Sequence, residues 1–246
     1  MKYLIIIFTV IAISLYSNWA YGRIYATIGE KNLPNPTMNQ KIILPASKAR
    51  AKKIVYVAMG DSLTAGVGAS GEDKSYPYLL AKMLAEKQNA QVTLINLAVP
   101  GAVASDVLKN QVLQVAQFHP DIVSLAIGVN DMHNQVPGKL FAQTMSEIVD
   151  KLNTTTKHLN IINIPFIGGS SVFLPPYRLY FDLQTKRYNS LLNKALVGRQ
   201  ANIIDLYSLT REKAFYNQLY YSADGFHPGD AGYDFWSKAL YDYFDY

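Results

Sequence analysis

Short apolar runs alternate along the chain with segments in which apolar residues recur at a helical spacing. The runs occupy positions 53–59, 91–99, 121–128, 160–166 and 201–207. Each is almost continuously apolar, as expected of strands that are covered on both faces. The intervening segments repeat apolar residues three and four apart, as Leu80, Met83 and Leu84 do. This alternation predicts an α/β fold of three layers, α/β/α, with a five-stranded parallel sheet and right-handed crossovers.

The first 22 residues follow another pattern, because no charged residue occurs between Lys2 and Arg23. The apolar part suits the core of a signal peptide, with small residues at Ala20 and Gly22 for cleavage. The uncharged run is also about long enough to cross ~30 Å of hydrocarbon as a retained anchor. Residues 3–22 therefore predict either a signal peptide or a membrane anchor. In both cases we expect the remainder to be exported, either secreted or held at the outer face of the membrane.

Residues 23–52 contain three prolines and no apolar period, which predicts a linker ahead of one domain at 53–246. The formal net charge is +5. Positions 1–53 hold eight basic residues and one acidic residue, whereas positions 54–246 hold 15 basic and 17 acidic. Because the positive excess lies outside the domain, we expect no nucleic-acid partner. The chain has no cysteine, which excludes disulfides, thiolate metal ligands and a cysteine nucleophile.

Three predicted strands end in residues that can take part in chemistry. Asp61-Ser62 follows Gly60 after the first strand, Gly101 follows the second, and Asn130 follows the third. Ligands in parallel α/β sheets bind at the carboxyl ends of the strands, so these residues are expected to meet. A hydroxyl, a backbone N–H without a side chain beside it and an amide suit attack on a carbonyl and stabilisation of an oxyanion. Each motif alone is also a common turn, and we expect Asp61 to hold its turn through backbone hydrogen bonds.

Near the C-terminus, Asp224 and His227 stand three residues apart ahead of a predicted helix, for which Asp230 is the expected N-cap. A carboxylate at this spacing can accept the Nδ1–H of the imidazole and leave Nε2 free to take a proton. His119 and His133 also lie near strand ends but have no acidic partner at this spacing. No two histidines have the spacing of metal ligands, so we expect no metal site.

Gly60-Asp61-Ser62-Leu63, Gly101 in NLAVPGA, Gly128-Val129-Asn130-Asp131 and Asp224-Gly225-Phe226-His227 together resemble the four motif blocks of the SGNH hydrolases, also called GDSL esterases and lipases. The resemblance covers residues 53–246. It implies a flavodoxin-like sheet of order 2-1-3-4-5 and hydrolysis of esters or thioesters through an acyl-enzyme, without a cofactor. One small departure is Gly229 after His227-Pro228, where family members often have Asn.

Carried over by position, Ser62 resembles the nucleophile, His227 the general base and Asp224 the acid that orients it. Gly101 and Asn130, with the backbone N–H of Ser62, resemble the oxyanion hole. An imidazole is suited to accept a serine proton at neutral pH, and three donors from three strand ends can meet the resulting alkoxide.

Substrate choice is expected in the loop 165–181, where Phe166, Phe173 and Tyr177 could line an acyl pocket. The same rings could instead pack on the sheet. The substrate class predicted first is a lipid or a small acyl ester. The alternatives are an O-acetylated polysaccharide attacked by the same catalytic set, and a non-catalytic binding domain of the same fold.

Overall fold

The computed structural model describes residues 2–29, 40–46, 51–212 and 217–246. Within them, six strands form one sheet in the order β1-β3-β2-β4-β5-β6. The strands are β1 (Gln40–Leu44), β2 (Lys52–Gly60), β3 (Ala90–Asn96), β4 (Ile122–Ala126), β5 (His158–Ile162) and β6 (Asn202–Ile204). The five strands β3-β2-β4-β5-β6 run parallel to one another. They are the predicted strands in the predicted order 2-1-3-4-5, so the α/β fold class is confirmed.

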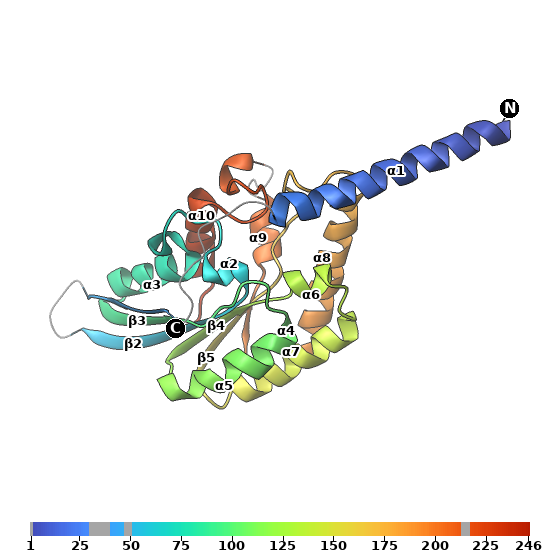
Figure 1. The fold of residues 1–246 in the computed structure, drawn as a ribbon. Helices are drawn as coiled ribbons and strands as arrows, with labels where there is room; N and C mark the ends of the chain where they lie inside the picture. The colour runs from blue at the N-terminus through green and yellow to red at the C-terminus, as the bar shows by residue number, and fades with distance from the viewer. Residues whose placement is uncertain (1, 30–39, 47–50, 213–216) are drawn as a thin grey trace.

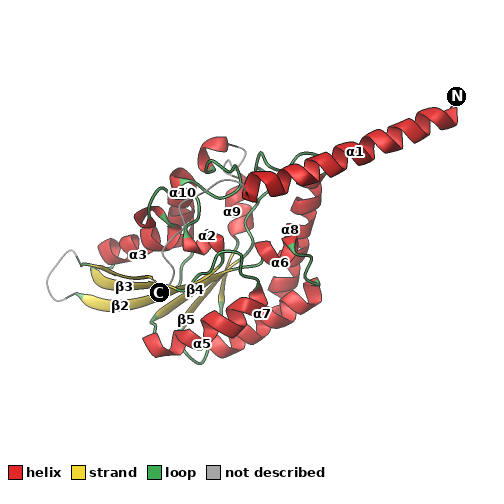
Figure 2. Cartoon of the chain, viewed as in Figure 1, coloured by secondary structure: helices red, strands yellow, loops and turns green. Residues whose placement is uncertain are grey.

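Helices cover both faces of the sheet (Figures 1 and 2). On one face α3 packs against α10, and on the other α7 packs against α5 and α8. The helices are α1 (Lys2–Gly29), α2 (Ser62–Ala65), α3 (Tyr76–Lys87), α4 (Ala104–Asp106), α5 (Val112–Val115), α6 (Val129–His133), α7 (Gly138–Leu152), α8 (Tyr177–Ala195), α9 (Leu206–Glu212) and α10 (Asp230–Tyr241). Single turns are η1 (Glu72–Lys74), η2 (Val107–Gln111), η3 (Ala116–Phe118) and η4 (Gln218–Tyr220).

The sixth strand, β1, lies in the region predicted to be an irregular linker. It pairs antiparallel with β3, from Gln40 opposite Asn96 to Leu44 opposite Val92, so the sheet is mixed rather than purely parallel. Leu44 is buried and Ile42 packs against the core, whereas Ile43 points to solvent. A five-residue strand between prolines has no period of its own that is strong enough to read. It forms because the edge of β3 offers unpaired N–H and C=O groups.

Helix α1 continues to Gly29, well past the predicted boundary at residue 22. Its stretch Lys2–Ile24 is long and apolar enough to cross a membrane, a property that signal sequences share. The residues before Ser17 are exposed, and Figure 1 shows this part of the helix projecting from the rest of the molecule. Ala20 and Ile24 are buried against the domain.

The last helix is fastened to the first crossover by aromatic side chains. Tyr76 on α3 lies 6.2 Å, centroid to centroid, from Trp236 and 6.4 Å from Tyr233, both on α10. All three rings are buried. The Tyr233 hydroxyl donates to the carbonyl oxygen of Val67, 2.7 Å away, in the loop that follows α2. These contacts hold the segment that carries His227 beside the end of β2.

Candidate active site

Ser62 is the first residue of α2, immediately after β2 ends at Gly60. Asp61 caps this short helix by accepting a hydrogen bond from the Leu63 N–H at 3.0 Å. The predicted role of Asp61 in holding the turn is therefore confirmed. Asp61 is almost fully buried, and burial, with the carboxylate of Asp131 nearby, raises its pKa to about 7.

Gly60 allows the strand to end this close to its neighbour. Its φ is +147°, and a Cβ at this position would lie 2.2 Å from the carbonyl oxygen of Ala126 on β4. The buried Gln111 side chain pairs with the Gly60 backbone, accepting from its N–H at 2.9 Å and donating to its carbonyl at 2.8 Å. The close approach to β4 and the pairing with Gln111 hold the end of β2 in place, and they therefore hold the backbone of Ser62, two residues later.

A continuous row of hydrogen bonds joins Ser62, His227 and Asp224. The Ser62 Oγ lies 3.0 Å from Nε2 of His227, and Nδ1 of His227 lies 2.6 Å from Oδ2 of Asp224. Asp224 is fully buried and His227 nearly so. The structure therefore brings together the three residues that the sequence predicted as nucleophile, base and orienting acid.

The charge of Asp224 is stabilised by four donors. Its Oδ1 accepts from the Ser222 hydroxyl at 2.7 Å and from the backbone N–H groups of Phe226 and His227 at 2.8 and 3.0 Å, while Oδ2 faces the His227 ring. Burial alone would raise the pKa of Asp224, but these hydrogen bonds and the imidazole outweigh it and hold the pKa below its ordinary value. Asp224 is thus held as a carboxylate beside Nδ1.

The loop of His227 is tied back at several points. The Ser222 N–H donates to the His227 carbonyl at 2.8 Å, and the Ser170 hydroxyl donates to the Gly225 carbonyl at 2.6 Å. Asp230 is not the N-cap of α10, since Gly229 holds that position. The Asp230 carboxylate instead accepts from the Ser70 N–H and hydroxyl at 2.7 and 2.6 Å, which joins the loop after α2 to the start of α10.

The predicted oxyanion donors lie on loops that meet beside Ser62. Asn130 Nδ2 donates to the Ala102 carbonyl at 3.0 Å and, at the longer distance of 3.4 Å, to Oδ2 of Asp61. It therefore touches the residues adjoining Gly101 and Ser62. Gly101 has a φ of +82°, and a Cβ there would meet nothing within 4 Å, so its side of the loop is open. Asp131 bonds to the same loop, where its carboxylate accepts from the Ala104 N–H at 3.2 and 3.0 Å.

The three predicted substrate-binding residues lie in different surroundings. Phe173 belongs to a ring group with Phe181, Phe226 and His133, in which Phe173 and Phe181 are 4.6 Å apart between centroids. Phe226 contacts the His227 ring at 5.1 Å, so this group adjoins the imidazole. Phe166 packs edge-on against Tyr207 at 5.8 Å. Tyr177 faces α1 and donates from its hydroxyl to the Ser17 carbonyl at 3.1 Å.

His133, which the sequence analysis set aside because it has no acidic partner, is also a member of the ring group. Its ring lies 4.9 Å from Phe181, and its Nε2 is buried without a hydrogen-bond partner among the described residues. Burial lowers its pKa to about 4, so the ring is neutral at neutral pH. The signal that could have found it is its position on α6, three residues after Asn130.

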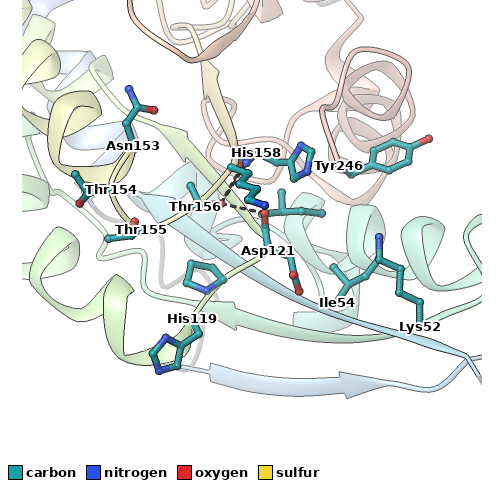
Figure 3. A pocket seen from close by; sticks show the side chains of 13 residues that line it. Lys52, Ile54, His119, Asp121, Asn153, Thr154, Thr155, Thr156, His158 and Tyr246 are labelled. Carbon is teal, nitrogen blue, oxygen red and sulfur yellow. Dashed lines mark hydrogen bonds between the residues drawn. The ribbon is translucent and has the colours of Figure 1, made fainter.

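A hollow of about 460 Å³ lies at the opposite edge of the sheet (Figure 3). Lys52, Asp121 and His158, which line it, stand at the amino ends of β2, β4 and β5. It is therefore separate from Ser62, which stands at a carboxyl end. Within the described ranges, no group of three or more histidine or acidic side chains could hold a metal ion.

Comparison with known proteins identifies the class. The profile of the GDSL-like lipase/acylhydrolase family matches residues 58–235. The chain is 26% identical over 207 residues to the uncharacterized protein YpmR of Bacillus subtilis, which covers 76% of this chain and 80% of that one. It is 30% identical over 119 residues to an arylesterase of Vibrio mimicus, covering 48% of this chain and 57% of the arylesterase. The structure of Axe2, an acetylxylan esterase from Geobacillus stearothermophilus, superposes with a TM-score of 0.61 at 16% identity, over 80% of this chain and 96% of that one.

The fold and the family profile define a hydrolase of ester bonds. The chain belongs to the GDSL-like lipase/acylhydrolase family, as the resemblance of its four motif blocks implied.

Proposed function

We propose that the protein hydrolyses a carboxylic ester or thioester through an acyl-enzyme formed on Ser62. The observation that supports this most directly is the row from Ser62 Oγ to His227 Nε2, 3.0 Å, and from His227 Nδ1 to Asp224, 2.6 Å. A serine hydroxyl is a weak nucleophile until a base takes its proton. His227 is placed to do so, and Asp224 to hold the tautomer that keeps Nε2 free and to stabilise the imidazolium.

The proposed reaction has two balanced halves. In the first, Ser62 Oγ attacks the carbonyl carbon and its proton passes to His227. The tetrahedral alkoxide then collapses, and the alcohol or thiol leaves with that proton. In the second, water attacks the acyl group with His227 again as base, which releases the acid and restores Ser62.

The proposed oxyanion donors are the backbone N–H groups of Ser62 and Gly101 and the amide of Asn130. We propose that the alkoxide takes the place of Asp61 as an acceptor of the Asn130 amide, because the 3.4 Å bond to Asp61 is long and therefore weak, and an alkoxide at ordinary hydrogen-bond distance binds the N–H more strongly. The shorter bond to Ala102 would keep the amide in position. Removing one such donor typically lowers turnover roughly 10²- to 10³-fold.

For the substrate we propose a lipid or a small acyl ester. The ring group of Phe173, Phe181, Phe226 and His133 adjoins His227. Phe173 and Phe181 are buried, so the partly exposed rings of Phe226 and His133 are the proposed contacts of an acyl chain. Removal of O-acetyl groups from a polysaccharide is the second candidate, favoured by the structural likeness to an acetylxylan esterase. A series of p-nitrophenyl esters from acetyl to dodecanoyl separates the two. A sharp optimum of kcat/KM at acetyl supports the polysaccharide, and a maximum at longer chains supports the lipid.

We also propose that α1 directs export, so that the catalytic part acts outside the cytoplasm. Its apolar stretch is compatible with a signal peptide and with an anchor. We propose a folded unit that starts before the predicted residue 53, because β1 belongs to the sheet.

The test of the proposed nucleophile is reaction of the purified full chain with a fluorophosphonate, located by peptide mass spectrometry. We expect the label on Ser62 and its loss in Ser62→Ala. The matched control is Ser190→Ala, a change at an exposed serine on α8, which should label as the parent does. A folded chain that leaves Ser62 unlabelled would refute an activated serine.

A further inference from the structure

The position of α1 on the domain limits how the protein can sit on a membrane. Residues 2–16 are exposed, whereas Ser17, Ala20 and Ile24 lie against the domain. Fifteen exposed residues at ~1.5 Å each extend about 22 Å. The hydrocarbon core of a bilayer is ~30 Å thick and takes about 20 residues to cross. The exposed part of α1 is therefore too short to cross the bilayer alone. If α1 crosses a bilayer, the residues that complete the crossing are those that contact the domain, and the domain surface around them must enter the headgroup layer.

That neighbouring surface is the N-terminal half of α8. Tyr177, its first residue, donates to the Ser17 carbonyl at 3.1 Å and packs its ring 5.5 Å from that of Tyr21. Figure 1 shows α1 leaving the domain beside this end of α8. The contact uses Ser17 and Tyr21 and is flanked by Trp19, which is 58% exposed. Tyrosine and tryptophan are enriched at the boundary between hydrocarbon and headgroups.

The exposed face of α8 has the composition of a membrane-surface helix. Leu179 and Leu183, one turn apart, are 62% and 53% exposed. Lys186 and Arg187 follow on the same exposed face, and Arg178 is exposed at the start of the helix. Exposed apolar side chains beside basic ones are typical of helices that lie in an anionic lipid interface.

The charge of α8 stands out from that of the domain. The helix holds four basic residues and one acidic residue, while positions 54–246 as a whole hold 15 basic and 17 acidic. Asp182, the single acid, is already paired with Lys186 at 2.7 Å. Among the described residues, neither Arg178 nor Arg187 forms an ion pair with an acidic side chain. Both are therefore available to the phosphate groups of lipids.

We propose that α1 is retained as a membrane span and that the exposed face of α8, from Arg178 to Arg187, rests in the headgroup layer of the same membrane, against anionic phospholipid. This arrangement also gives a role to the contacts of Ser17 and Tyr21 with Tyr177, which fix the direction in which α1 leaves the domain. It goes beyond ester hydrolysis and does not depend on the catalytic assignment.

The absence of cysteine from the sequence makes a site-specific test direct, because one introduced thiol is unique. The full chain carrying Leu183→Cys is labelled with bimane and reconstituted into vesicles of phosphatidylglycerol and phosphatidylcholine that contain nitroxide-headgroup lipid. We expect strong quenching. The matched control is Leu113→Cys on α5, where the side chain is 74% exposed on a different part of the surface, and there we expect little quenching. Equal quenching at both positions, or none at Leu183→Cys, would overturn the proposal.

A second variant tests the charge. Arg178→Gln combined with Arg187→Gln in the Leu183→Cys chain should lower the quenching at least twofold in these vesicles. Hydrolysis of a soluble short ester should be unchanged, so a failure here is distinguishable from a failure of the catalytic proposal. Unaltered quenching would show that the contact does not use anionic lipid. The intact mass of the native protein supplies a further check, since loss of residues 1–22 would overturn the retained span.

Discussion

Three buried carboxylates stand near Ser62, and their surroundings give them different states. Asp224 has four donors around it and a pKa below the ordinary value, whereas burial raises the pKa of Asp61 to about 7 and that of Asp131 to about 6. A residue that stabilises an imidazolium must itself be charged at neutral pH. Asp224 meets this condition, and Asp61, although adjacent to Ser62, serves the turn.

Asp224→Asn should therefore lower kcat by roughly 10³- to 10⁴-fold while the chain stays folded, because the amide favours the wrong tautomer of His227. The measurements are steady-state hydrolysis of a short ester and thermal unfolding by circular dichroism. Asp61→Asn is the matched control and should retain far more turnover. Comparable losses of kcat in both variants would contradict the assignment of Asp224, rather than Asp61, as the carboxylate that orients His227.

His133 should make the protein less stable in acid. Its pKa in the folded chain, about 4, lies below the ~6.5 of a free imidazole, so between these pH values the unfolded chain binds more protons. Stability then falls as the pH drops from ~6.5 to ~4, by up to about 3 kcal/mol from this residue. In His133→Phe this component should vanish, as urea unfolding at pH 7 and at pH 4.5 can show. An equal pH dependence in both proteins would contradict the burial of a neutral ring.

At the scale of elements, the sheet explains what the sequence could and could not predict. The five parallel strands were readable because each lies in an almost continuous apolar run between segments of helical period. Four of the five runs extend past the ends of their strands, which are β3, β4, β5 and β6. After β5 the chain enters a buried loop, and after β6 Leu206 begins α9. β1 was not readable, because its place depends on the edge of β3 rather than on its own pattern.

Deleting β1 should expose that edge. A fragment 53–246 should melt at a lower temperature than a fragment 40–246 and aggregate faster, because the N–H and C=O groups of β3 become available to other chains. Differential scanning calorimetry and light scattering measure the two effects. Identical melting and scattering would show that β1 contributes nothing to the sheet.

At the scale of the whole molecule, residues from distant parts of the chain make the candidate site. The sequence predicted its polar residues because each follows a strand or precedes the last helix. It could not predict the apolar surroundings. Phe173 lies in the ring group beside His227, whereas Tyr177 contacts α1 and Phe166 packs against Tyr207. These contacts depend on how the loop after β5 packs against the rest of the protein, and no local sequence pattern predicts that packing.

Since the packing of α10 on α3 holds His227 in place, activity should be lost together with the fold. In a urea titration, the rate of ester hydrolysis and the helical signal should fall at the same midpoint. Loss of the rate at a clearly lower urea concentration would mean that the segment around His227 detaches on its own.

The bond between Ser62 and His227 spans 165 positions of the chain. A ribosome completes Ser62 long before it reaches His227, so under the proposed mechanism the growing polypeptide carries a serine without the base that activates it. If this chain crosses a membrane unfolded, it crosses without ester-hydrolysing activity. Its hydrolytic power would then arise only on the far side, once the last helix has closed against the first crossover, with no propeptide needed to restrain it beforehand.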